Sequence, residues 1–324
     1  MLSRVADSIF WMSRYVERAE NVARFIDVNW NLLLDSGSTQ DEQWQPLINA
    51  TGDEEAFAKR YTSGTRENVI RFLTFDTENP NSIICCVRAA RENARTVRDV
   101  ISPEMWEQMN SFHLMLKDAA TDSKAFDSPH EFFSQVKMAS HLFLGMTDTT
   151  MGHGESWNFY RLGQLLERCD KTSRILDVKY YMLHSSSTDS DADGIQWAAV
   201  LKSASGLEMY RKRHRRIVPE RVVEFLLFDP EFPRAAFFCI KTANEALHAI
   251  TNTPAGQSSC AAEEQLNRIC ADIQKTTAAD VLISGLHQYV DSLQTKLNEV
   301  GVALHEGFFS TEDKPTQTQS QSQG

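Results

Sequence analysis

The chain has 324 residues, of which 42% are hydrophobic and 24% charged, a composition that excludes a wholly disordered protein. Its 44 acidic and 33 basic side chains give a formal net charge of −11, which argues against general nucleic-acid binding because that function needs a basic face. The length predicts about two domains, and the low content of glycine (14) and proline (9) favours long helices over many short strands.

The composition also bears on location. No stretch approaches 18 consecutive apolar residues, so no transmembrane helix is predicted. Charged residues near the N-terminus break the apolar core that a signal peptide would need. The six cysteines have no C-x-x-C spacing and most lie among apolar residues, as reduced, buried thiols do. We therefore predict a cytoplasmic protein with no metal site and no cofactor.

The first predicted element is one long amphipathic helix over residues 5–33, in which apolar side chains recur at steps of three and four. A charged stripe with the spacing i, i+3, i+7, i+10 runs beside the apolar one and consists of Glu17, Glu20, Arg24 and Asp27. Arg18 lies about 100° from Glu17 around the helix, so the two side chains need different partners.

Two interpretations of this charged stripe stay open. It is either a ladder of ion pairs at the border of the apolar face, in which the Glu20–Arg24 spacing contributes about 0.2–0.5 kcal/mol, or a set of charges that meets another helix and lines a polar cleft. The second half of the chain has a stripe with the same four charge signs, which both interpretations would explain.

A helix over residues 81–101 follows, with an arginine row at the same spacing, made of Arg88, Arg91, Arg95 and Arg98. Glu92 lies beside this row. Guanidinium groups bind carboxylates and phosphates through two parallel hydrogen bonds. The row is therefore either a paired or solvated face, or an anion site. Further along, Ser102-Pro103 predicts a helix start, and Ser128-Pro129-His130-Glu131 predicts a capping box.

The second half of the chain repeats the first. An offset of 150 aligns Glu17-Arg18 with Glu167-Arg168, and an offset of 153 aligns residues 72–80 with 225–233. A second long helix over residues 159–183 thus carries its own charged stripe, made of Glu167, Asp170, Arg174 and Asp177. Lys241 and Asn244 replace two arginines of the row, so an anion site on that helix is expected in the first half.

These patterns predict an all-α protein built from two tandem, duplicated helical-bundle repeats of about six helices each. The repeats are expected at residues 1–150 and 151–310, followed by a disordered polar tail at residues 311–324. A basic run at residues 211–216 is either a solvated helix end or a contact for an acidic partner or a phosphate. His153 and Glu155 lack the spacing of a helical metal pair, and no nucleophile elbow, P-loop or dinucleotide fingerprint is present.

The chain resembles the bacterial alpha-E family. The resemblance rests on the opening block, residues 2–21, on residues 75–82 and 90–95, and on residues 157–170 for the second repeat. It covers residues 1 to about 300. The family is named for an α-helical unit with a Glu-Arg motif, which maps onto Glu17-Arg18 and Glu167-Arg168.

The resemblance implies a role in a peptide synthesis or modification system. The expected neighbours are a circularly permuted ATP-grasp ligase, a transglutaminase-like protein and an NTN-type peptidase. Our leading hypothesis is an accessory helical component that binds such a partner or an anionic or peptide ligand. The alternatives are an enzyme in its own right, using a Glu/Arg-lined cleft for amide or carboxylate chemistry, and a purely structural scaffold.

Whether the protein is an enzyme stays open at this point, and no catalytic residue is assigned. No membrane or nucleic-acid partner is expected. The candidate polar cleft is expected among charged residues of three helices: Glu17, Arg18, Glu20, Arg24, Asp27, Arg91, Glu92, Arg95, Glu167, Arg168, Asp170, Arg174 and Asp177.

Overall fold

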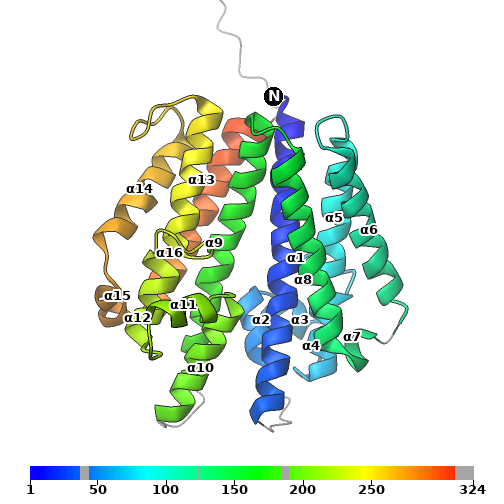
Figure 1. The fold of residues 1–324 in the computed structure, drawn as a ribbon, viewed down its shortest axis with the longest axis vertical. Helices are drawn as coiled ribbons and strands as arrows, with labels where there is room; N and C mark the ends of the chain where they lie inside the picture. Colours follow the sequence, from blue (N-terminus) through cyan, green and yellow to red (C-terminus); the bar gives the residue numbers. More distant parts are fainter. Residues whose placement is uncertain (37–43, 123, 184–189, 311–324) are drawn as a thin grey trace, which may run out of the picture.

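The computed structural model of the chain describes residues 1–36, 44–122, 124–183 and 190–310, and all regular elements within them are helices. Two long helices, α1 (Ser3–Ser36) and α9 (Glu155–Leu183), run side by side through the centre (Figure 1). The predicted helices over residues 5–33 and 159–183 are thereby confirmed. Apolar side chains of both helices, such as Met12, Ala19, Phe159 and Leu162, are buried in the core.

Three further long helices surround α1, and their bounds are α5 (Ile83–Thr96), α6 (Pro103–Ala119) and α8 (Pro129–Thr150). Both α5 and α8 pack against α1, and α6 packs against α5 and α8. Short helices complete this half: α2 (Gln45–Thr51), α3 (Glu54–Ala58), α4 (Arg66–Thr74) and α7 (Lys124–Asp127).

The helices around α9 have the same pairings. Here α13 (Ala236–Thr251) and α16 (Leu286–Leu304) pack against α9, and α14 (Ala261–Lys275) packs against both of them. The remaining elements are α10 (Ser190–Ser203), α11 (Leu207–Arg213), α12 (Pro219–Val223), α15 (Ala278–Ser284) and the π-helical turns η2 (Glu224–Phe228) and η3 (His305–Phe309).

Equal pairings in the two halves are what a tandem repeat would produce. The duplication itself, the number of six helices per half and the limits 1–150 and 151–310 stay predictions. The predicted tail at residues 311–324 lies outside the described residues.

The structure revises two local predictions. The helix expected over residues 81–101 is shorter, because the Ser82 side chain caps its start and Val97 leaves the helical backbone conformation. The capping box predicted at Ser128 is wrong: α8 begins at Pro129, but the Ser128 side chain accepts no capping hydrogen bond. By contrast, the Ser102 hydroxyl does cap α6, accepting a hydrogen bond from the Met105 amide.

The six cysteines form no disulfide; four are buried and two are half-buried, as predicted for reduced thiols.

The backbones of α1 and α9 lie close together at Gly163. A Cβ atom at this position would clash with the Phe10 carbonyl oxygen and the Ser13 hydroxyl. Gly163→Ala should therefore push the two central helices apart and lower the free energy of unfolding by about 1–3 kcal/mol, measured by urea titration. The matched control is Gly145→Ala in α8, where a Cβ meets nothing within 4 Å. It should stabilise the protein by up to about 1 kcal/mol. Equal effects of the two substitutions would contradict this description of the helix contact.

Candidate functional site

The two Glu-Arg motifs exchange partners across the contact between α1 and α9. The Arg168 guanidinium donates two hydrogen bonds to the Glu17 carboxylate, at 2.9 Å from Nε and 2.8 Å from Nη2. The Arg18 guanidinium does the same to Glu167, at 2.7 Å and 3.0 Å. Each motif therefore supplies the counterion for the other. We refer to this arrangement as the exchanged pairs.

Helix geometry explains why the pairs are exchanged and not local. Neighbouring residues on a helix point about 100° apart, so a Glu and the Arg that follows it cannot bond each other side by side. With α1 and α9 in contact, each glutamate faces the other helix's arginine. Glu17 and Glu167 are both buried, and a buried charge is tolerated only when it is paired and hydrogen-bonded.

Protein cations saturate the Glu167 carboxylate. Besides Arg18, it accepts a hydrogen bond from Arg14 Nε at 2.9 Å, and Lys171 Nζ lies 3.5 Å from it. The Glu167 side chain is 0% exposed. Arg18 also donates to the Asn81 side chain. This side of the contact therefore has the character of a closed structural network.

The surroundings of Glu17 differ. Arg234 lies just before α13, where its carbonyl accepts a hydrogen bond from the Thr172 hydroxyl of α9. Its guanidinium bridges two carboxylates, donating to Glu17 at 3.0 Å and to Glu20 at 3.1 Å. Arg24 completes the cluster with two hydrogen bonds to Glu20, at 2.7 and 2.9 Å. Three guanidinium groups thus face two carboxylates.

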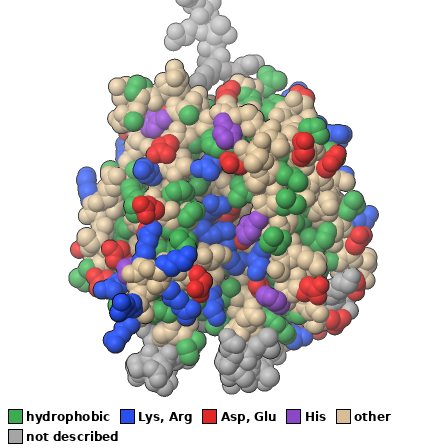
Figure 2. Space-filling view, in the orientation of Figure 1, with side chains coloured by type: hydrophobic (Ala, Val, Ile, Leu, Met, Phe, Trp, Pro, Cys, Tyr) green, Lys and Arg blue, Asp and Glu red, His purple; other side chains and the backbone are tan. Residues whose placement is uncertain are grey.

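A cavity of about 210 Å³ opens beside this cluster, which we call the Glu17 cleft. Its charged lining consists of Glu17, Glu20, Arg168 and Arg234, joined by Ser13, Ser140, His141, Tyr160 and Gln164. Gln164 is 3% exposed, and its Oε1 atom has no hydrogen-bond partner. An unpaired buried amide oxygen is costly, so this atom marks a vacant acceptor at the cleft wall. Figure 2 shows Lys and Arg side chains gathered in the middle of this face of the molecule.

The pKa values in the cluster reflect strong pairing. Burial alone would raise the pKa of Glu17, but the charge and hydrogen bonds of Arg168, together with the charge of Arg234, lower it below its usual value. For Glu20 the charges of Arg234 and Arg24 likewise outweigh burial and lower its pKa. Burial and the charge of Arg234 lower the pKa of Arg24 to about 10. The cluster is therefore ionised at neutral pH and carries an excess of one positive charge.

These pairings predict a loss of stability in acid. The pKa values of Glu17, Glu20 and Glu167 are all lowered in the folded protein, whereas unfolded glutamates titrate near about 4.3. Below that pH the unfolded state binds more protons than the folded state, so the free energy of unfolding falls as the pH falls. Urea titrations from pH 7 to pH 3 should show stability constant above about pH 5 and declining below it. The Glu17→Gln variant should show a shallower decline, whereas Glu67→Gln, which removes an exposed pair with Arg71, should keep the full slope. A flat profile in the wild type would contradict the pairing.

The other predicted site residues lie around this centre. Asp27 of α1 contacts His130 and Lys137 of α8, at 2.6 Å each. Asp177 of α9 contacts His287 of α16, also at 2.6 Å. Asp170 accepts hydrogen bonds from Lys171 and Arg174. The contacts of Asp27 and Asp177 tie long helices together within each half, whereas those of Asp170 lie within α9.

The arginine row of α5 is placed elsewhere. Arg91 donates to Asn110 of α6 and lies over the Trp106 ring, 5.4 Å from its centroid. Glu92 accepts hydrogen bonds from Arg91 and Arg95, and both Glu92 and Arg95 are well exposed. None of the three lines the Glu17 cleft. The structure brings Glu17, Glu20, Arg24 and Arg168 together, and Arg234 fills the role that the arginine row was a candidate for.

Arg234, Gln164 and His141 are cleft residues that sequence reasoning missed. A signal for two of them is present in the repeat. Extending the offset of 153 by one residue pairs Asn81 with Arg234, and the offset of 150 pairs Arg14 with Gln164. From the first half to the second, the neutral Asn81 is replaced by the cation Arg234, and the cation Arg14 is replaced by the neutral Gln164. These two exchanges account for the difference between the open Glu17 side and the closed Glu167 side.

A second basic surface lies at the C-terminal end of α11 and the start of α12. A groove of about 700 Å³ is lined there by Arg213, His214, Arg215, Arg216, Arg221 and two glutamates, Glu220 and Glu224. Arg213 is paired with Asp229 and Glu231. Within the described part of the chain, Arg215, Arg216 and Arg221 have no ion pair. We call this surface the α11–α12 groove; it is a second concentration of Lys and Arg side chains in Figure 2.

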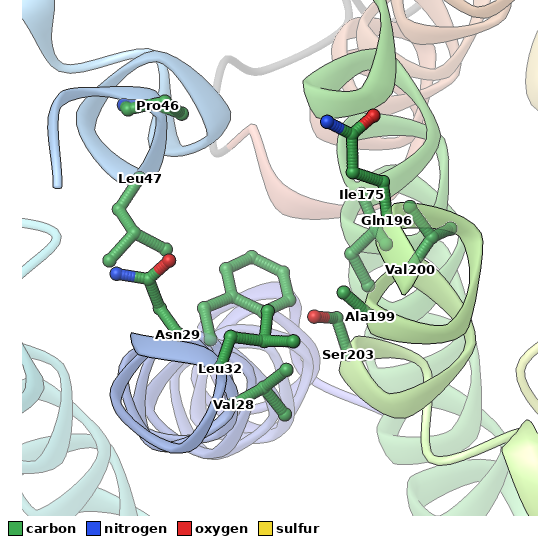
Figure 3. A pocket seen from close by; sticks show the side chains of 11 residues that line it. Val28, Asn29, Leu32, Pro46, Leu47, Ile175, Gln196, Ala199, Val200 and Ser203 are labelled. Carbon is green, nitrogen blue, oxygen red and sulfur yellow. The ribbon is translucent and has the colours of Figure 1, made fainter. Parts of the chain in front are cut away.

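A third cavity is small and apolar. Its volume is about 50 Å³, and side chains of α1 and α2, among them Leu32 and Leu47, face those of α10, among them Ala199 and Val200 (Figure 3). It offers little polar chemistry. No group of three or more His, Cys, Asp or Glu side chains suited to a metal ion occurs in the described ranges, and none of the helices there is long and apolar enough to cross a membrane.

The fold and the site define an all-helical protein organised around exchanged glutamate–arginine pairs on its two central helices. Residues 1–309 match the alpha-E family, described as a predicted alpha-helical domain with a conserved ER motif. The chain belongs to this family.

Among similar proteins are uncharacterized proteins of Mycobacterium bovis and Mycobacterium tuberculosis. Each is 22% identical over 336 residues, an alignment that covers 98% of this chain and 37% of the mycobacterial protein. The chain thus spans less than two fifths of the length of these relatives. No solved structure shows a significant match.

Proposed function

We propose that this protein is a binding component of a peptide synthesis or modification system, in which the Glu17 cleft holds an anionic group of the ligand. One observation carries this proposal: a cavity is lined by the buried Arg168 and the half-buried Arg234, and an amide oxygen at its wall is unpaired. With Arg24, the charged cluster beside the cavity carries one positive charge in excess. An anionic group would neutralise the excess charge of the cluster by accepting hydrogen bonds from the arginines, and a donor elsewhere on the same ligand would pair the amide oxygen.

The pairing of the carboxylates favours binding over catalysis. A general base works best with a pKa near the working pH, whereas arginine charges lower the pKa of Glu17 and Glu20. If the protein were instead an enzyme of amide or carboxylate chemistry, Glu17→Gln would abolish turnover while the chain stayed folded. A purely structural role would explain the closed network around Glu167. It would not explain why a cavity lies beside Glu17.

The expected partners are a circularly permuted ATP-grasp ligase and a transglutaminase-like protein, as the family resemblance implies. Two features support a role beside other protein domains. The mycobacterial relatives carry the matched region within a much longer chain. The α11–α12 groove also offers three arginines that have no counterion among the described residues, which suits an acidic surface of a partner.

The direct test is co-purification with the expected ATP-grasp ligase, followed by a ligation assay with and without this protein. The proposal predicts a complex and a change in ligation rate. No association and no effect on ligation would contradict it.

The Arg215→Glu/Arg216→Glu double variant should weaken partner association at least about 10-fold, because like charges at an interface repel. The effect should shrink as salt is raised. The control is Arg211→Glu/Lys212→Glu, which alters the charge by the same amount outside the groove. An equal loss in both variants, measured by surface plasmon resonance, would count against the groove as the docking surface.

We also propose that the two halves are repeats of one ancestral helical unit, since the same helix pairings occur in both. A cytoplasmic location is proposed as well, consistent with six unpaired thiols.

A further inference from the structure

The Glu17 cleft combines three kinds of group on one wall. Arg168 and Arg234 provide positive charge, Glu17 and Glu20 provide paired negative charge, and Gln164 provides an amide that forms no hydrogen bond with the described protein. A simple inorganic anion would satisfy the arginines alone. It would leave the buried Gln164 oxygen unpaired, because this atom needs a hydrogen-bond donor and a fully deprotonated anion has none.

The donors for an anion are in place. Arg234 uses Nη1 and Nη2 to reach the two glutamates, and its Nε has no acceptor among the described residues. Arg168 Nη1 makes only a long contact, 3.4 Å, to the Pro233 carbonyl. Both guanidinium groups therefore keep N–H capacity for a ligand carboxylate.

On the Glu167 side of the contact between α1 and α9, a protein cation occupies the position that corresponds to Gln164. At the position that an offset of 150 assigns to Gln164, the chain has Arg14, whose guanidinium bonds directly to Glu167. Asn21 similarly replaces Lys171. The Glu167 carboxylate has three cationic partners and no exposure, whereas the Glu17 side has two neutral amides where cations would be and keeps a cavity instead.

From this juxtaposition we infer that the Glu17 cleft binds the C-terminal end of a peptide, with its terminal carboxylate on Arg168 and Arg234 and its last amide N–H on Gln164. The inference rests on the proposed binding function and names the ligand class. A volume of about 210 Å³ is below the usual range of about 300–1,000 Å³ for sites that enclose a whole ligand. It suits the end of a chain whose remainder extends out of the cleft.

The test uses three probes in calorimetric or NMR titrations: N-acetyl-alanyl-alanine, the same dipeptide with an amidated C-terminus, and acetate. The acid should bind the wild-type protein at least about 10-fold more tightly than the amidated form, because a hydrogen-bonded charge is lost. Gln164→Leu should weaken binding of the acid about 5- to 10-fold, the value of one hydrogen bond to an amide. The loss should be larger for the acid than for acetate, which has no donor for this oxygen.

The outcomes separate this inference from the proposed function. Equal binding of the acid and the amidated peptide overturns the peptide terminus as ligand. Equal weakening of acetate and peptide by Gln164→Leu also overturns it, because it would show that Gln164 only maintains the cleft. Acetate binding without peptide binding overturns the inference but leaves the anion-binding function standing. If no probe binds, both fail.

Discussion

Glu167→Gln should lower the free energy of unfolding by about 3–5 kcal/mol, the usual effect of removing one partner of a buried ion pair. The substitution keeps the shape of the side chain and removes only its charge. Three cations, Arg14, Arg18 and Lys171, would then lose their shared counterion in a fully buried position. Because single-domain proteins are stable by only about 5–15 kcal/mol, the variant should be close to unfolding at room temperature.

Urea titration followed by far-ultraviolet circular dichroism measures this effect. Glu92→Gln is the control: its carboxylate also has two arginine partners but is exposed, so its loss should change stability by no more than about 1 kcal/mol. The double variant Arg18→Gln/Glu167→Gln should be more stable than Glu167→Gln, since fewer charges are left unpaired. An effect below about 1 kcal/mol for Glu167→Gln would mean that the exchanged pairs do not hold the central helices together.

The second large effect is on binding. Arg234→Gln removes the guanidinium that bridges Glu17 and Glu20 and with it the excess positive charge of the cluster beside the Glu17 cleft. The affinity for acetate or inorganic phosphate should fall at least about 10-fold, because charge-assisted hydrogen bonds from arginine are lost. Stability should fall less than in Glu167→Gln, since Glu17 keeps Arg168 and Glu20 keeps Arg24.

The matched control for this variant is Arg216→Gln in the α11–α12 groove. It changes the net charge of the protein equally and leaves the cleft intact. Titration of both variants with the same anion should show a loss of affinity in Arg234→Gln alone. A similar loss in both would indicate a nonspecific effect of charge.

Much of the fold follows from residue periodicity. The apolar side chains of residues 5–33 recur at helical spacing, and this alone predicts α1 within a few residues of its ends. Helix geometry also shows that Glu17 and Arg18 need separate partners. Periodicity cannot show that the charged stripe itself is buried. In the structure α1 is surrounded on several sides, so Glu17, Glu20 and Arg24 lie inside the protein beside the apolar stripe.

The cleft was harder to predict because its residues come from four separate elements. Gln164 and Arg168 lie on α9, Glu17 on α1, His141 on α8, and Arg234 in the segment before α13. Spacing within one helix assigns a residue to a face but does not say which helix will cover that face. The arginine row of α5, which the sequence left open as a paired or solvated face or an anion site, pairs with Glu92 and Asn110 and lies away from the cleft.

The capping motifs show the same limit on a smaller scale. Ser102 and Ser128 precede a proline at the same position, yet only Ser102 has the extended backbone and the capping hydrogen bond. Ser128 follows the short helix α7, its backbone is not in the extended conformation, and its hydroxyl accepts no capping hydrogen bond. The sequence pattern therefore predicted where both helices begin but not how each of them is capped.

The most direct test of the Glu17 cleft as an anion site is a titration of protein labelled with ¹⁵N-arginine, in which the Nε–H resonances of the arginines are followed by NMR as acetate is added. Variants at Arg168, Arg234 and Arg216 assign the relevant signals. The account predicts saturable shifts of the Arg168 and Arg234 resonances at acetate concentrations that leave Arg216 unchanged. Shifts confined to Arg216 and its neighbours in the α11–α12 groove, with Arg168 and Arg234 unmoved, would contradict it.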